Sequence, residues 1–152
     1  KTYEGTFTLI GSGWKMKDFV YKEKINYLGS LWGEKVYEYY SKAVCCLGLL
    51  MEALTENGVG DEITGRSLTV PSYGGLLLHP RNKSSQKLYG QRSFCLYDNI
   101  NEAAIKANNI LKDKNLRLRI FKEQHKEVIS KADFVEDFVP ELIKLCQDRK
   151  FI

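Results

Sequence analysis

Arg66 is the residue whose position most clearly suggests chemistry, because it falls in the first turn of a predicted short helix. Thr64 is a suitable N-cap, and Gly74 and Gly75 suit the end of the helix, since glycine adopts the left-handed conformation found there. Pro71 should keep the helix short or bent. A helix N-terminus exposes backbone N–H groups and carries positive dipole charge. An arginine at this point therefore predicts either a site for an anion such as a phosphate or a surface arginine that caps a nearby loop.

Further candidates for ligand contact lie in loops beside predicted strands. The run 6–10 predicts a strand, and Ser12 and Gly13 follow it in a Gly-Ser-Gly turn. This turn either lets a phosphate approach the backbone or only reverses the chain. His79 follows the apolar run 76–78, and it either touches a ligand or packs within its loop. Tyr73 either stacks on a nucleotide base or packs against its neighbours.

The hydrophobic pattern predicts the elements that must position these residues. Strands are expected at 6–10, 25–28, 44–50, 76–78 and 93–97, with 44–50 as a central strand. Helices are expected at 34–43, after Thr64, after Ser84 or Ser85 as caps, at 99–112 and 116–130, and in a region from Phe134 to Leu145. Alternating strands and helices predict an α/β fold with a parallel sheet covered by helices on both faces.

Ligands of such sheets bind outside the carboxyl ends of the strands. The loops 11–14, 29–33, 51–64 and 79–81 follow predicted strands, so we expect them to converge on one edge of the sheet. The chain of 152 residues suits one domain, residues 1–152. Its net charge of +4 would help to attract a phosphate but falls short of the signature of a nucleic-acid-binding protein.

Cysteine usage favours a reducing compartment and argues against a metal centre. Cys45 and Cys46 are adjacent, and no Cys-x-x-Cys pair or cysteine–histidine spacing typical of metal ligands occurs. We therefore expect free thiols. No apolar run approaches the ~20 residues needed to cross a bilayer. The basic run 112–119 has two interpretations: it contacts a phosphate-rich or membrane-surface partner, or it is the solvated side of a helix pair.

Four segments in order resemble a known enzyme family. These segments are similar to the C-terminal half of GT-B glycosyltransferases: GSGW, LGSLWGEKVYEYYSKAVCCLGLL, TGRSLTVPSYGGLLLH and FCLYDNINEA. The spore-maturation-type branch, related to glycosyltransferase families 1 and 4, is the most similar. The resemblance covers Thr6 to about Leu145. Its most specific part is the spacing of Arg66, Pro71, Gly74 and Gly75.

The resemblance implies a Rossmann-like domain that binds a nucleotide-sugar and needs no other cofactor. It also implies metal-independent transfer in the cytoplasm, an acceptor-binding domain preceding Lys1, and possible peripheral contact with a membrane. The resemblance further implies that seven residues surround the donor: Arg66, Gly74, Gly75, Ser12, Gly13, Tyr73 and His79.

Related enzymes carry two acids eight residues apart, and these positions correspond to Asp61 and Thr69. The second acid usually contacts the ribose, where a threonine offers a hydroxyl but no charge-assisted hydrogen bond. Asp61 either contacts the sugar or is an ordinary loop carboxylate. Two functions therefore stay open: glycosyl transfer together with a partner domain, or a binding or scaffolding domain that has lost transfer.

Overall fold

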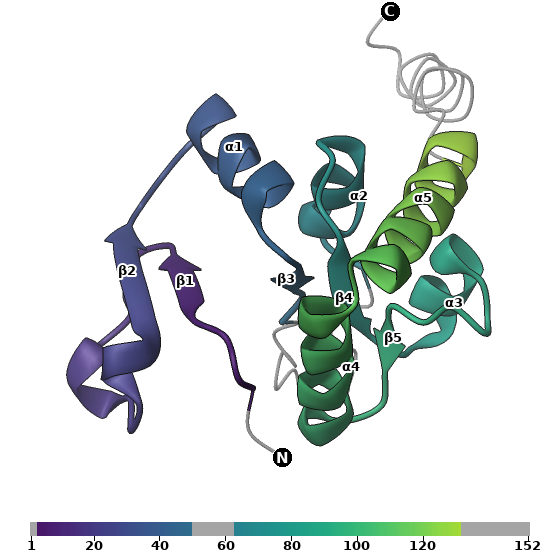
Figure 1. Cartoon of the computed structure of the whole chain (residues 1–152). Helices are drawn as coiled ribbons and strands as arrows, with labels where there is room; N and C mark the ends of the chain where they lie inside the picture. Colours follow the sequence, from purple (N-terminus) through teal and green to yellow (C-terminus); the bar gives the residue numbers. More distant parts are fainter. Residues whose placement is uncertain (1–2, 50–62, 132–152) are drawn as a thin grey trace, which may run out of the picture.

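Five short strands form two parallel sheets in the computed structural model of the chain, which describes residues 3–49 and 63–131 (Figure 1). Strand β1 (Phe7–Ile10) pairs with β2 (Ile25–Gly29). Strands β3 (Cys46–Leu47), β4 (Leu77–Pro80) and β5 (Leu96–Tyr97) form the second sheet, in the order β3-β4-β5. The predicted α/β class with parallel strands and a Rossmann-like pattern is confirmed. The strands are divided between two sheets, whereas one sheet was expected.

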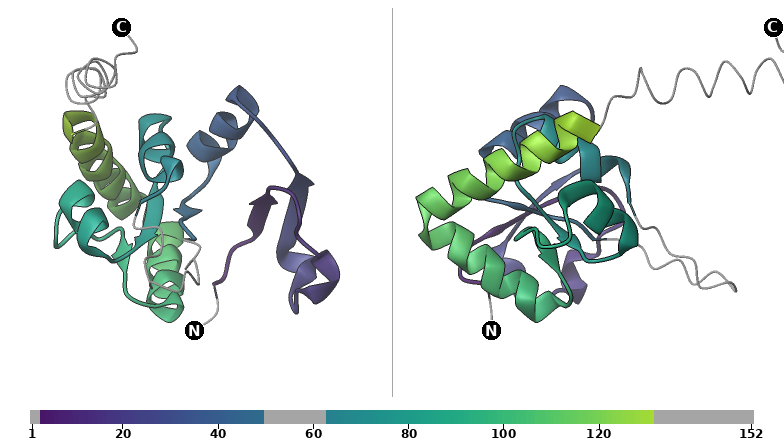
Figure 2. Two further views of the ribbon diagram at one scale, coloured as in Figure 1. Left: turned by 180° about the vertical axis from the view of Figure 1, so that it is seen from behind. Right: turned by 90° about the vertical axis from the view of Figure 1, so that its right-hand side faces the viewer.

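Within residues 3–49 and 63–131, five α-helices connect and cover the strands, and Figure 2 gives two further views of them. They are α1 (Glu34–Lys42), α2 (Gly65–Ser72), α3 (Lys83–Tyr89), α4 (Ile100–Lys112) and α5 (Lys114–Lys131), and two 3₁₀ turns, η1 (Met16–Asp18) and η2 (Lys22–Lys24), precede β2. The helices expected at 34–43, 99–112 and 116–130 are confirmed to within a few residues. The helical region expected from Phe134 to Leu145 lies outside the described residues.

Two local predictions are wrong. The run 44–50 is not a central strand: β3 has two residues and lies at one side of the described three-stranded sheet, with β4 in the middle. β4 takes the central place because Leu76, Leu77 and Leu78 are almost fully buried. The cap of α3 is Asn82, whose side chain accepts from the N–H of Ser85 at 2.7 Å, so Ser85 lies in the helix as the other half of a capping box.

The core lies between the three-stranded sheet and helices α3, α4 and α5. Its buried apolar side chains include Leu78, Leu96, Ile110, Ile120 and Val128. Gln124 of α5 is only 2% exposed although it is polar. Its amide accepts from the N–H of Leu77 and donates to the carbonyl of Leu77, each at 2.8 Å. Gln124 thereby supplies both hydrogen bonds that a neighbouring strand would otherwise give to Leu77.

We expect Gln124→Leu to lower the free energy of unfolding by roughly 2–4 kcal/mol. Leucine keeps most of the side-chain volume but leaves a buried N–H and a buried carbonyl of Leu77 without partners, at about 1–3 kcal/mol for each unsatisfied group. Urea unfolding of both proteins measures the difference. The same change at the exposed Gln91 should stay within about 0.5 kcal/mol of the parent. Equal stability of the Gln124 variant and the parent would contradict this role.

Candidate functional site

The amino end of α2 is built by a reciprocal pair of hydrogen bonds. The N–H of Thr64 donates to the hydroxyl of Ser67 at 3.1 Å, and the side chain of Thr64 accepts from the N–H of Ser67. The N–H groups of Gly65 and Arg66 are left without an intrahelical acceptor. A Cβ atom placed on Gly65 would meet nothing within 4 Å. Among the described residues, nothing next to Gly65 therefore blocks the approach of an anion to this end of the helix.

Ser67 and His79 fix this helix end onto the sheet. Both side chains are almost fully buried, and the Ser67 Oγ lies 2.9 Å from Nε2 of His79. Nδ1 of His79 lies 2.8 Å from the carbonyl of Pro80, which can only accept. Nδ1 must then carry the proton, and Nε2 accepts from the hydroxyl of Ser67. The hydroxyl of Tyr89 in α3 donates to the carbonyl of Ser67, so β4 and α3 both hold the start of α2.

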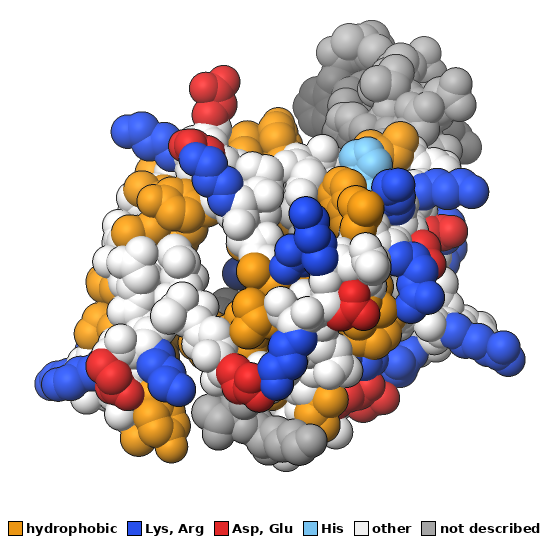
Figure 3. All heavy atoms as spheres, in the orientation of Figure 1, with side chains coloured by type: hydrophobic (Ala, Val, Ile, Leu, Met, Phe, Trp, Pro, Cys, Tyr) orange, Lys and Arg blue, Asp and Glu red, His pale blue; other side chains and the backbone are white. Residues whose placement is uncertain are grey.

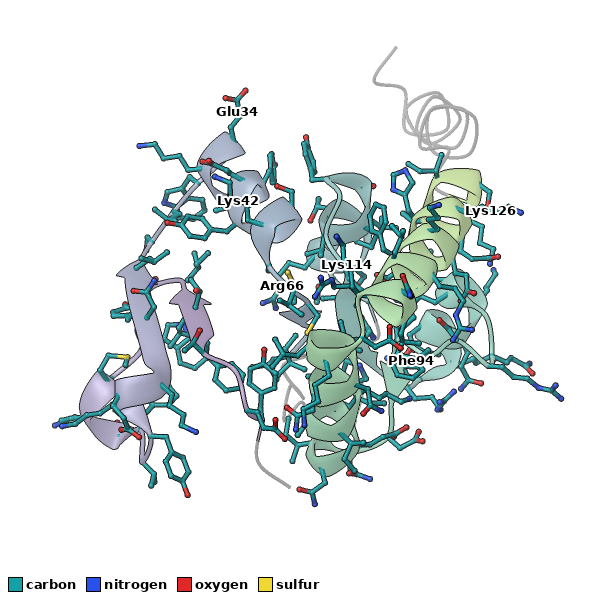
Figure 4. The ribbon with its side chains drawn as sticks, viewed as in Figure 1. Glu34, Lys42, Arg66, Phe94, Lys114 and Lys126 are labelled. Atoms are coloured by element: carbon teal, nitrogen blue, oxygen red, sulfur yellow. The ribbon has the colours of Figure 1, made fainter. Side chains whose placement is uncertain are left out.

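The guanidinium of Arg66 is oriented by the backbone that follows β3. Its Nη2 donates to the carbonyl of Leu49 at 3.1 Å, and the side chain lies beside β3 (Figure 4). Gly48 fixes the position of Leu49, because Gly48 donates to Leu78 at 2.7 Å and accepts from the hydroxyl of Tyr97 at 2.6 Å. One edge of the guanidinium is thus held, and its other N–H groups make no ion pair within residues 3–49 and 63–131.

Arg66 is exposed, and none of the carboxylates in residues 3–49 and 63–131 forms an ion pair with it. Arg81, which follows β4, differs. Its guanidinium donates to Asp98 and to the carbonyl of Gln91, both at 2.8 Å. Within the described ranges, Arg66 is therefore the arginine at this edge of the sheet whose charge stays uncompensated.

The charge of Arg66 reaches two neighbouring side chains. Burial lowers the pKa of His79, and the positive charge of Arg66 lowers it further, against the opposing effect of the hydrogen bond to Pro80. Burial raises the pKa of Tyr40, with a further rise from Cys46, whereas Arg66 acts to lower it. Helical spacing in the sequence gives no sign that Tyr40 of α1 lies beside Arg66.

Thr69 lies one turn beyond Arg66, and Tyr73, Gly74 and Gly75 lie at the opposite end of α2. Thr69 is half-buried and shares a face with Arg66 at the i, i+3 spacing. The ring of Tyr73 stacks on Tyr37 of α1, with centroids 3.8 Å apart. A Cβ atom on Gly75 would lie 2.9 Å from the carbonyl of Tyr40 and 2.7 Å from the side chain of Val70, so this glycine admits close approach of α1. The structure therefore does not bring Tyr73 and the two glycines together with Arg66.

Ser12 and Gly13 follow β1 and belong to the other sheet. Gly13 has a φ of +81°, which favours glycine in this turn. No strand pairing joins β1 or β2 to β3–β5 in the part of the chain that the structure describes, and Figure 1 shows the two sheets apart. The expected convergence of four loops on one sheet edge is therefore not observed for the loop 11–14. Asp61 lies outside the described residues.

Comparison with known proteins adds a family match. Residues 1–136 match the family model described as "Glycosyl transferase-like". Neither a curated protein nor a solved structure matches the chain. Among the described residues, none of the helices has the length and apolar character needed to cross a bilayer, and no group of three or more histidine, cysteine or acidic side chains could hold a metal ion.

We expect the buried His79 to make the protein less stable as the pH falls below about 7. Because the pKa of His79 is lowered in the folded state, the unfolded state binds more protons between that pKa and the ordinary value near 6.5. The free energy of unfolding should fall through this window by up to about 1.4 kcal/mol per pH unit.

Urea unfolding at pH 7.5, 6.5 and 5.5 measures this dependence, and comparison with His79→Gln isolates it from other groups. The variant should lose the part of the slope that His79 contributes. An identical pH dependence in both proteins would show that His79 does not titrate in this window.

Proposed function

Because the chain belongs to the glycosyl transferase-like family, we propose that it binds the nucleotide-sugar donor of a glycosyltransferase. The observation that carries the proposal is the exposed guanidinium of Arg66, oriented by Leu49 beside the open amino end of α2. A diphosphate is an anion that suits this arrangement, since the N–H groups of Gly65 and Arg66 and the free edge of the guanidinium could bind its oxygens.

The chemistry of sugar transfer explains why such a site is needed. The bond from the anomeric carbon to the phosphate oxygen breaks, the acceptor oxygen forms the new bond, and the electron pair leaves with the nucleotide diphosphate. Negative charge therefore develops on the phosphate, where a preorganised cation and helix end stabilise the transition state. Because Arg66 is already held at Nη2, little reorganisation is required. In this proposal a preceding acceptor-binding domain, as in the GT-B fold, supplies the acceptor, and the enzyme works in the cytoplasm.

The supporting parts of the site have distinct roles in this proposal. Ser67 and His79 position α2, and the buried His79 makes no direct contact with the donor. Gly74 and Gly75 set the packing of α1 against α2. Thr69, on the same face of α2 as Arg66, would lie toward the ribose. Ser12 and Gly13 would reach the donor only if the two sheets approach one another.

A second candidate function is binding without transfer. It is favoured by Thr69, which cannot form the charge-assisted hydrogen bond that an acid offers to a ribose hydroxyl. A thermal-shift screen against nucleotide diphosphates and nucleotide-sugars tests binding, because a ligand at 100 times its Kd stabilises the folded state by about 2.7 kcal/mol. Activity of the full-length protein decides between transfer and binding alone.

We expect Arg66→Ala to weaken binding of a nucleotide diphosphate by roughly 10- to 150-fold, since hydrogen bonds to a charged group contribute about 1.5–3 kcal/mol. Arg66→Lys should recover part of the loss, because lysine keeps the charge but not the planar fork. Calorimetric titration with the diphosphate that stabilises the parent most measures both effects.

Arg92→Ala serves as the matched control. Arg92 is exposed and precedes β5, and its loss changes the net charge by the same amount. This variant should keep the parent's affinity within about twofold. Unchanged affinity in Arg66→Ala would remove Arg66 from the site and, with it, the physical basis of the donor-binding proposal.

Restoring an acid at position 69 should raise affinity for ligands that contain a ribose. We expect Thr69→Glu to strengthen nucleotide diphosphate binding by about tenfold through a charge-assisted hydrogen bond, and to leave binding of inorganic pyrophosphate unchanged or weaker. Parallel titrations with the two ligands measure the ratio. Thr69→Gln has a similar size without the charge and should show a smaller gain. If Thr69→Glu changed the affinities for the nucleotide diphosphate and for pyrophosphate by the same factor, residue 69 would not contact the ribose.

A further inference from the structure

Helix α5 is rich in basic residues. It contains six lysine and arginine residues and two glutamates, a net charge of +4. A net charge of +4 on one helix of 18 residues produces a positive electrostatic potential along that helix.

Most of these cations are not neutralised locally. Lys131 pairs with Glu127, and Arg119 approaches Glu123 at 4.0 Å. The other four make no ion pair with any carboxylate of the described residues: Lys114, Arg117, Lys122 and Lys126.

The outward side of α5 combines these charges with apolar side chains. Lys114, Leu118 and Lys122 follow one another at intervals of four residues and therefore lie along one side of the helix. Leu118 is 50% exposed, and Ile129, further along the same side, is 56% exposed. Figure 3 shows blue and orange side chains mixed over this helix, and Figure 4 labels Lys114 at its start and Lys126 in its second half. We call this surface the basic face of α5; it comprises Lys114, Leu118, Lys122, Lys126 and Ile129.

A cavity of about 210 Å³ adjoins the first turns of α5. Lys114 and Arg117 contribute two cations to its lining, and no carboxylate lines it. Apolar side chains form much of the remaining wall: Val44, Leu76, Leu118 and Phe121. Two cations together with apolar side chains in one lining suit an anionic group attached to hydrocarbon, such as the phosphate and glycerol carbons of a lipid headgroup.

We propose that the basic face of α5 docks on an anionic membrane surface, with a lipid phosphate at the cavity between Lys114 and Arg117. Surface lysines and arginines each favour an anionic leaflet, and exposed leucine and isoleucine side chains can enter the interfacial region. Nucleic acid suits this face less well, because single strands are usually held by stacking on exposed aromatic side chains, and Phe121 at the cavity is half-buried and already stacked on His125. The proposal is independent of the donor site, since Arg66 lies on α2 and takes no part in it.

Co-sedimentation of the full chain with vesicles tests the proposal. We expect binding to phosphatidylcholine vesicles that contain 30% phosphatidylserine, little binding to pure phosphatidylcholine, and weaker binding as salt rises. Replacing three lysines together, Lys114→Gln, Lys122→Gln and Lys126→Gln, should lower the partition coefficient by about 100-fold. Glutamine is a good helix former, so the fold should persist, and circular dichroism checks it.

The matched control replaces three exposed lysines on α1 and α3, Lys35→Gln, Lys83→Gln and Lys87→Gln, with the same loss of charge. It should bind the vesicles within about threefold of the parent. Leu118→Ser with Ile129→Ser should remove the binding that persists at high salt. Equal loss in the lysine control, or no binding to anionic vesicles, would overturn the proposal. Binding of a single-stranded RNA but not of vesicles, abolished by the α5 substitutions, would overturn it in favour of nucleic acid.

Discussion

The hydrogen bond between Ser67 and His79 is the interaction on which the candidate site depends. Ser67 belongs to the cap of α2, and His79 lies in β4, so one buried contact fixes both the start of the helix and its position over the sheet. Burial excludes water as an alternative partner, and a neutral His79 with its proton on Nδ1 accepts from the serine. Because Ser67 is held in this way, the N–H groups of Gly65 and Arg66 are fixed in place before any ligand arrives.

Short strands are a second constraint on this fold, and side chains compensate for them. β3 and β5 have two residues each, so they satisfy only part of the backbone of β4. Gln124 completes the hydrogen bonding of Leu77, and Tyr97 binds the carbonyl of Gly48. These bonds avoid the cost of unpaired buried polar groups. They also link the core to the site, because Gly48 precedes the carbonyl that orients Arg66.

Positive charge is arranged in two different ways in this protein. At the edge of the three-stranded sheet, one arginine stands beside a helix end with its orientation set by backbone contacts, while Arg81 nearby is neutralised by Asp98. Such a rigid and local cation suits a compact anion. Along α5, several flexible lysines are spread over a helix that also exposes leucine and isoleucine. A diffuse field of this kind suits an extended surface.

The sequence by itself determined the elements of local origin. Thr64 as a cap, the glycines at the end of α2 and the buried run 76–78 depend on neighbouring residues and on solvent exclusion, which a sequence pattern records. Tertiary structure decided which of these residues meet. It placed Gly74 and Tyr73 against α1 rather than with Arg66, and it left Ser12 on a separate sheet. The partners of Ser67, Arg66 and Gln124 are 12, 17 and 47 residues away along the chain, and no local pattern encodes a contact over such a separation.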